Sequence, residues 1–232
     1  MSTTTLSAKK LIVAGVALSA ALGLGACSSG TSSAASDSTT ASSNTHSARP
    51  EPIASLSAIP AGGSTAVALD TNFVSALGTL GLTPATIGTA TLADGSVSFP
   101  ITGGTVTVFD KSSGYRPYVQ GTLLHQNSGL SLTAGGTTVE LTNFTVDPGT
   151  PARLFGDVAV NGQQAAASAP LFDLDGTTLN PITMDSSGNA VLQGTTVKLS
   201  PEAAALLNQT FGTDALAGGL VIGIATITVP TS

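Results

Sequence analysis

The chain has 232 residues, of which 41% are hydrophobic and only 9% are charged, and its formal net charge is −6. A sparse negative charge repels phosphate backbones, which excludes nucleic acid as an expected partner. The single cysteine excludes an internal disulfide, so packing and strand pairing have to stabilise the folded part.

The first 26 residues have the order of a secretory signal peptide. A polar segment ends in Lys9 and Lys10, an apolar run extends from Leu11 to Leu24, and small residues follow. The run of about 14 residues is shorter than the roughly 20 that a helix needs to span a bilayer. Leu24-Gly25-Ala26-Cys27 resembles the lipobox of bacterial lipoproteins, and the resemblance implies cleavage before Cys27 and lipidation of its thiol.

We therefore expect the mature chain to be anchored in the cell membrane through lipidated Cys27 and to face the extracytoplasmic side. Residues 27–60 are dominated by Ser, Thr and Ala, with Pro50, Pro52 and Pro60 towards the end, which predicts a disordered stalk. Residues 61–232 are then expected to form a single domain, which is long enough for a real core.

Beyond the stalk, short alternating or apolar runs predict β-strands. Asp94-Gly95 and Asn161-Gly162 lie between such runs, and these dipeptides supply the positive φ angles that tight hairpins require. The other runs lie at residues 105–109, 121–125, 130–133, 137–146, 153–160 and 190–199. So many short strands predict a mainly β fold, an antiparallel sandwich or barrel-like domain.

Two short helices are expected among the strands. One extends from Pro201 to Phe211, with Ser200 as a suitable N-cap and proline at its first position. The other begins after Asp70 and places Phe73 and Leu77 on one face. Both helices carry an apolar stripe that can pack on a sheet.

The segment 171–179, Leu-Phe-Asp-Leu-Asp-Gly-Thr-Thr-Leu, resembles the first motif of haloacid-dehalogenase-type phosphatases. In that family the first aspartate, here Asp173, attacks phosphorus, and the second, here Asp175, acts as acid and base. The family needs a parallel sheet with further acids on successive strand–helix units, and the remaining residues do not show that pattern. The segment is more typical of a strand that ends in an Asp-Gly turn, so a phosphatase is the minor alternative.

Other catalytic and metal sites are not expected. His125 is the only histidine of the predicted domain, and the only cysteine is assigned to lipid, so a nucleophile with an adjacent base is missing. We therefore predict that the chain is not an enzyme.

The segment Gly121–Val146 is similar to part of the haem-transport-associated domain of bacterial surface proteins, together with Phe99–Gly104 before it and Val197–Val229 after it. The shared features are a Gly-x-φ-x-His…Gly-Leu hairpin, where φ is apolar, and a closing strand, small-residue helix and strand. The resemblance implies a β-rich fold and, in haem-binding members, a tyrosine ligand supported by a histidine. His125 matches that histidine.

The tyrosine of that family comes from an early aromatic segment, and here the corresponding stretch offers only Phe73. Tyr115 and Tyr118 lie just upstream of His125, and they can replace it only if their loop folds over the histidine. Haem also favours large apolar pockets, whereas aromatic residues make up only 4% of this chain.

The main prediction is therefore a lipid-anchored, non-catalytic interaction or structural module of the cell envelope, with an envelope protein as its partner. The alternative is a module that binds haem or another small ligand through His125 with Tyr115 or Tyr118. No other cofactor is expected.

Overall fold

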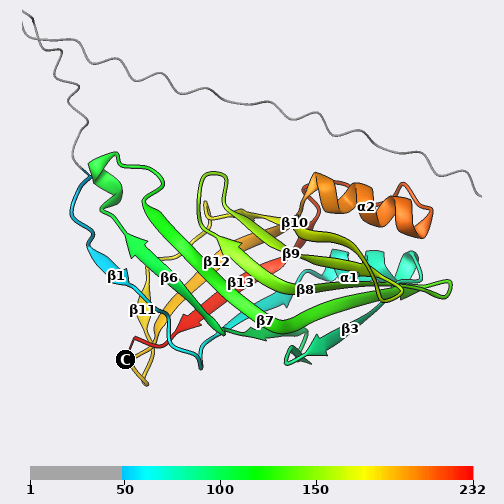
Figure 1. Cartoon of the computed structure of the whole chain (residues 1–232), viewed down its shortest axis with the longest axis horizontal. Helices are drawn as coiled ribbons and strands as arrows, with labels where there is room; N and C mark the ends of the chain where they lie inside the picture. The colour runs from blue at the N-terminus through cyan, green and yellow to red at the C-terminus, as the bar shows by residue number, and fades with distance from the viewer. Residues whose placement is uncertain (1–48, 232) are drawn as a thin grey trace, which may run out of the picture. The chain divides into compact units, whose positions relative to one another are not determined.

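The computed structural model describes residues 49–231, so the predicted signal peptide, the lipobox and Cys27 lie outside the described residues. The described chain folds into a curled antiparallel sheet, with two short helices at one end (Figure 1). Neither of these helices is long and apolar enough to cross a membrane.

The strands follow the chain with few interruptions. They are β1 (Ala54–Leu56), β2 (Ser64–Leu69), β3 (Thr83–Gly88), β4 (Thr91–Ala93), β5 (Ser96–Pro100), β6 (Gly103–Val108), β7 (Val119–Ala134), β8 (Thr137–Asp147), β9 (Arg153–Val160), β10 (Gln163–Asp175), β11 (Thr183–Met184), β12 (Ala190–Leu199) and β13 (Val221–Val229). The helices are α1 (Thr71–Thr79) and α2 (Pro201–Phe211), with a single turn of 3-10 helix, η1, at Lys111–Ser113.

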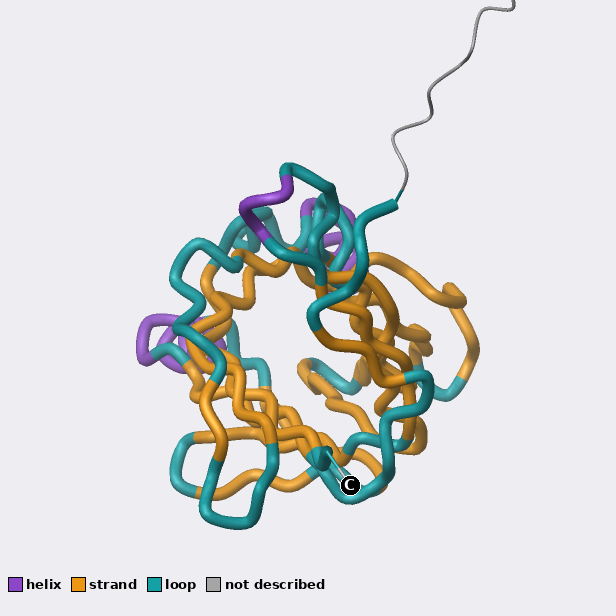
Figure 2. The backbone as a smooth tube through the Cα atoms, turned by 90° about the vertical axis from the view of Figure 1, so that its left-hand side faces the viewer, coloured by secondary structure: helices purple, strands orange, loops and turns teal. Residues whose placement is uncertain are grey.

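The sheet has the order β1-β6-β7-β8-β9-β10-β12-β13-β2-β5-β4, with β11 added to β12 and β3 added to β7. The pairings are antiparallel, including the one that joins the first and last long strands, β2 and β13. This arrangement confirms the predicted mainly β, barrel-like class. Figure 2 looks along the curl and shows strands on opposite sides of the interior.

Strand β7 accounts for much of the curl. Its first half pairs with β6 and its second half pairs with β3. Between the halves the register with β8 shifts, and Asn127 takes a φ of 58°. The two strands predicted at residues 121–125 and 130–133 are therefore one bulged strand, because the glycine and asparagine between them bend the chain without reversing it.

The predicted hairpin turns are confirmed. Asp94 and Gly95 have φ angles of 52° and 72° between β4 and β5, and Asn161 and Gly162 have 50° and 75° between β9 and β10. Two successive residues with positive φ match the twist of the flanking strands, which is why these dipeptides specify the turns.

Both predicted helix starts are also confirmed. The Asp70 carboxylate accepts hydrogen bonds from the backbone N–H groups of Asn72 and Phe73 at the start of α1. Ser200 accepts a hydrogen bond from the N–H of Ala203 at the start of α2. These caps satisfy N–H groups that have no partner inside the helix.

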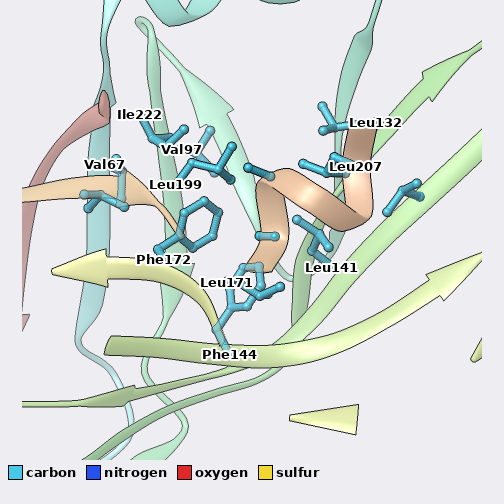
Figure 3. Close-up of a cluster of buried hydrophobic side chains, with 14 of the residues drawn as sticks. Val67, Val97, Leu132, Leu141, Phe144, Leu171, Phe172, Leu199, Leu207 and Ile222 are labelled. Carbon is cyan, nitrogen blue, oxygen red and sulfur yellow. The ribbon is translucent and has the colours of Figure 1, made fainter. Parts of the chain in front are cut away.

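The main core lies between the helices and the sheet. It includes Val67, Val97, Phe144, Phe172 and Leu199, and Leu207 of α2 lies beside Leu132 and Leu141 (Figure 3). A second, smaller cluster consists of Ile59, Ile101, Leu123, Val146 and Val229. Helix α2 contributes three buried side chains to the core, whereas α1 contributes only Leu77.

The predicted end of the stalk at residue 60 is too late. Residues Ala54–Leu56 form β1 on β6, the backbone N–H of Ile53 bonds to the carbonyl of Val108, and Ile59 is buried. The stretch is polar on average, and this average obscures three apolar residues at intervals of three: Ile53, Leu56 and Ile59. The rest of the predicted stalk lies outside the described residues.

Candidate functional site: an apolar interior beside His125

The concave side of the curled sheet encloses two adjoining apolar cavities. The α1 cavity, of about 70 Å³, is lined by residues of α1, β3, α2 and the sheet, among them Phe73, Leu77, Pro84, Ala85 and Leu92. The histidine cavity, of about 60 Å³, is lined among others by Thr65, Phe99, His125 and Phe144. Both cavities share the side chains of Leu69, Val97, Leu130, Phe172 and Ile222, so they adjoin each other across these five residues.

The α1 cavity reaches solvent at the edge strand β4. Leu92 pairs with Val97, which pairs with Val67, which pairs with Ala225, so these four residues form one row across the concave face. Three of them are buried, whereas Leu92 is 50% exposed. Because β4 ends the sheet and Leu92 also lines the cavity, this residue marks one side of the mouth; Pro84 and Ala85 of β3 also line the cavity and are exposed.

Helix α1 covers this cavity with a small contact surface. Leu77 is its only fully buried side chain, Phe73 is partly buried against the core, and Val74 is 49% exposed. Short elements with few buried apolar contacts open locally more easily than the rest of a domain. The helix that lines the α1 cavity is therefore the less buried of the two described helices.

His125 is fully enclosed at the other cavity, with 1% of its surface exposed. Its Nδ1 lies 3.0 Å from the carbonyl oxygen of Pro100, and its Nε2 lies 3.1 Å from Oγ1 of Thr65. A carbonyl oxygen can only accept, so we assign the proton to Nδ1, and Nε2 of the neutral ring accepts from Thr65. Neither partner was foreseen from the sequence, because they lie 60 and 25 residues away along the chain.

Burial lowers the pKa of His125, because an imidazolium ion loses its hydration inside the domain. Hydrogen bonds to backbone carbonyl groups, chiefly that of Pro100, act in the opposite direction but are smaller. His125 is therefore neutral at pH 7, and its two nitrogens serve to join β7 to β5 and β2.

The two glycines of the hairpin that carries His125 have a structural explanation. Gly121 has a φ of 128°, and a Cβ at this position would overlap the carbonyl oxygen of Thr105. At Gly129 a Cβ would overlap the carbonyl oxygen of Leu141. These close approaches between strands require glycine whatever the domain binds.

The structure does not bring Tyr115 or Tyr118 to His125. Tyr118 directly precedes β7, and its carbonyl accepts a hydrogen bond from the N–H of Phe109. Tyr115 packs edge-on against the Phe109 ring, with ring centroids 4.8 Å apart. Because seven residues of extended chain separate Tyr118 from His125, the two lie roughly 20 Å apart. The loop does not fold over the histidine, so in this structure neither tyrosine reaches His125 as the predicted pairing of His125 with Tyr115 or Tyr118 requires.

The aspartates of the phosphatase-like motif lie in ion pairs. Nε of Arg153 is 3.0 Å from Oδ1 of Asp173, and Nζ of Lys198 is 2.7 Å from Oδ2 of Asp175. The hydrogen bond from Lys198, followed by those from Thr177, holds the pKa of Asp175 well below its usual range. Their strand, β10, pairs antiparallel with β9 and β12, so the parallel sheet that the motif requires is absent here.

No protein-family model matches the sequence, and no curated protein is significantly similar to it. Among solved structures, the crystal structure of the C-terminal domain of HtaA from Corynebacterium glutamicum matches with a TM-score of 0.51 and 15% identity, over 74% of this chain and 98% of that one. The fold is similar to that of the HtaA domain. A domain-swapped dimer of a histidine-to-alanine variant of the HtaA domain matches with a TM-score of 0.42 and 16% identity, over 68% of this chain and 89% of that one.

The likeness to the HtaA domain confirms the fold that the Gly121–Val146 hairpin led us to expect. At this level of identity it establishes the fold alone. What this chain binds therefore has to be inferred from its own residues.

The described residues do not fit haem held by a coordinate bond. His125 is the only imidazole at either cavity, and both of its nitrogens are engaged in hydrogen bonds. Residues 49–231 contain no group of three or more histidine, cysteine, aspartate or glutamate residues that could hold a metal ion.

Proposed function

We propose that this chain is a lipid-anchored module of the cell envelope that binds a small apolar ligand inside the curled sheet. The observation that carries the proposal is the pair of adjoining apolar cavities inside the sheet, one of which is lined by half-exposed Leu92. Native cores are packed like organic crystals and contain few voids. Two adjoining apolar cavities inside the sheet, one of them lined by the sparsely packed helix α1, favour a binding role over a purely structural one.

The lining defines the chemistry of the ligand. Most of the side chains around both cavities are aliphatic or aromatic, and the polar pair Thr65 and His125 is already hydrogen-bonded. Contact with apolar surface, worth about 25 cal/mol per Å² buried, is therefore the main source of affinity. A ligand with a charged end would keep that end at the mouth, beside Leu92.

Entry of a ligand requires α1 to move, because the cavities are smaller than a typical small-molecule site. Displacing α1 removes one buried leucine from the core, whereas displacing α2 would remove three buried side chains. A ligand that enters under α1 and beside β4 therefore disrupts less of the core than one that enters under α2.

The proposal is tested with haemin and with metal-free protoporphyrin IX, two flat molecules with a largely apolar ring and two propionates at one edge, which differ by the iron. Residues 28–232 are titrated with each and followed by absorption and fluorescence. Because no coordinate bond is available, we expect both to bind with affinities within about threefold of each other.

Two neighbouring residues of α1 provide a matched pair of variants. Phe73→Glu places a charge at the lining of the α1 cavity and should weaken both porphyrins at least tenfold. Val74→Glu places the same charge on the exposed side, where it lines neither cavity, and should leave binding unchanged. Failure to bind either porphyrin, or tight binding of haemin alone that His125→Ala abolishes, would contradict the proposed apolar site.

A further inference from the structure

Three of the five cations in the described part of the chain lie on one small surface. Arg49, Lys111 and Arg116 are exposed there, and none of them forms an ion pair with another described residue. The other two, Arg153 and Lys198, are held in salt bridges. Ten of the twelve described carboxylates lie elsewhere along the chain. Free positive charge is thus confined to one place on an acidic domain.

Aromatic contacts build one half of this surface. Phe109 is fully buried, and the guanidinium carbon of Arg49 lies 4.7 Å from the centre of its ring. Tyr115 packs against the same ring. The 3-10 turn η1 lies between Phe109 and Tyr115, in the loop that joins β6 to β7. The buried ring fixes the first described residues to that loop.

Tyr118 organises the other half. The nitrogen of Lys111 lies 5.5 Å from the centre of its ring, and the guanidinium carbon of Arg116 lies 5.8 Å from it. Arg116 also donates hydrogen bonds to the carbonyl oxygens of Lys111 and Tyr115, at 3.2 and 2.8 Å. The loop therefore holds its cations beside amphipathic rings without the help of a carboxylate.

An exposed apolar side chain completes the arrangement. Ile53 is 68% exposed, the highest value among the large hydrophobic residues described, and its N–H bonds to the carbonyl of Val108, next to Phe109. We define the basic-aromatic surface as Arg49, Ile53, Lys111, Tyr115, Arg116 and Tyr118. Glu51 and Asp110 lie within it and reduce its net charge to one positive unit.

The basic-aromatic surface lies at the end of the domain where the described chain begins, and α1 and α2 lie at the opposite end (Figure 1). Cys27, the predicted lipid attachment site, lies 22 positions before Arg49 in the sequence, so a lipid anchor there would join the domain at this end. Such an anchor would raise the effective concentration of membrane at this surface, so even weak contacts could hold it there.

We propose that the basic-aromatic surface docks the domain on anionic phospholipid headgroups and turns the α1 cavity away from the membrane. Lysine and arginine next to an anionic surface each strengthen binding about fivefold. Tyrosine prefers the boundary between headgroups and acyl chains, and an exposed isoleucine can enter that boundary. This inference goes beyond ligand binding, and it concerns a different part of the domain.

The test uses residues 28–232, which lack the lipid but contain the whole compact unit from Ser47 onward. Sedimentation is measured with vesicles of equal parts phosphatidylglycerol and phosphatidylcholine, and with vesicles of phosphatidylcholine alone. The double variant Arg49→Gln with Lys111→Gln should bind the anionic vesicles about twentyfold more weakly than the parent. The control, Arg153→Gln with Lys198→Gln, removes the same charge from the salt bridges and should bind within about twofold of the parent.

A third variant separates membranes from soluble polyanions. Ile53→Ser changes no charge, so it should weaken vesicle binding severalfold only if the side chain enters the lipid. Equal binding to both kinds of vesicle, equal losses in the two double variants, or no effect of Ile53→Ser would each overturn the proposal. Porphyrin binding by the Arg49 and Lys111 double variant should match the parent, which keeps this test separate from that of the ligand site.

Discussion

His125 of β7 donates a hydrogen bond of 3.0 Å to the carbonyl of Pro100, at the end of β5, although seven places separate these strands in the order of the sheet. The N–H of Thr102 bonds to the carbonyl of Leu124 beside it. The curl of the sheet is therefore closed at this seam by a side chain as well as by the backbone. His125, which the sequence suggests as a ligand-binding residue, therefore helps to hold the strands together.

His125→Ala should destabilise the domain by about 2–4 kcal/mol, because it leaves a void and removes the partner of Thr65. Urea unfolding followed by circular dichroism measures the loss. Gln126→Ala serves as the control, since it keeps the backbone N–H that bonds to Thr102, and its change should stay below about 0.5 kcal/mol. A loss below about 1 kcal/mol for His125→Ala would contradict the role of the seam.

The stability of the domain should fall as the pH drops from 7 to 5. Burial lowers the pKa of His125 in the folded state below its ordinary value of 6.5, so in this window the unfolded chain binds more protons. The carboxylates with lowered pKa values, such as Asp157 and Asp175, lose their contribution only at about pH 4 and below. His125→Gln cannot be protonated, so its free energy of unfolding should change less over this window. An equal slope in parent and variant would exclude His125 as the cause.

Ser200→Ala should cost about 2–3 kcal/mol in unfolding free energy. Its hydroxyl donates to the carbonyl of Pro170 at 2.7 Å and accepts from the N–H of Ala203, and the residue is fully buried. The variant thus loses a helix cap and leaves the carbonyl of half-buried Pro170 without this hydrogen bond. Asp70→Ala removes the corresponding cap of the more exposed helix α1, and there we expect about 1 kcal/mol. Equal losses in thermal or urea unfolding would show that the bond to Pro170 is unimportant.

Cys27→Ser should abolish membrane anchoring of the full-length chain. Lipidation requires the thiol, so the variant should leave the membrane fraction or keep its leader uncut. Fractionation and intact mass measure both properties. If the variant were cleaved normally and remained in the membrane fraction, the lipobox prediction would be wrong.

The sequence predicts most of the fold because the relevant signals are local. The turns at Asp94-Gly95 and Asn161-Gly162 and the caps at Asp70 and Ser200 act within a few residues, and the structure has each of them. The sequence does not predict β1, because a strand of three residues in a stretch rich in serine and alanine shows no clear alternation of polar and apolar side chains.

The candidate site is less predictable, because it depends on contacts between distant segments. His125 could be selected as the only histidine of the domain, but its partners Thr65 and Pro100 come from other strands. Tyr115 and Tyr118 are close to His125 in sequence, yet an extended strand keeps them apart. The cavities cannot be predicted from the sequence, because many of the residues that line them are apolar residues of the ordinary core.

The most direct test of the apolar ligand site is hydrogen–deuterium exchange of residues 28–232 with and without saturating metal-free protoporphyrin IX. A ligand in the α1 cavity should slow exchange in α1 and β3 and leave the loop from Phe109 to Tyr118 unchanged, because that loop lies at the other end of the domain. Slower exchange in that loop alone, or no change in α1 despite saturation, would contradict binding inside the curled sheet.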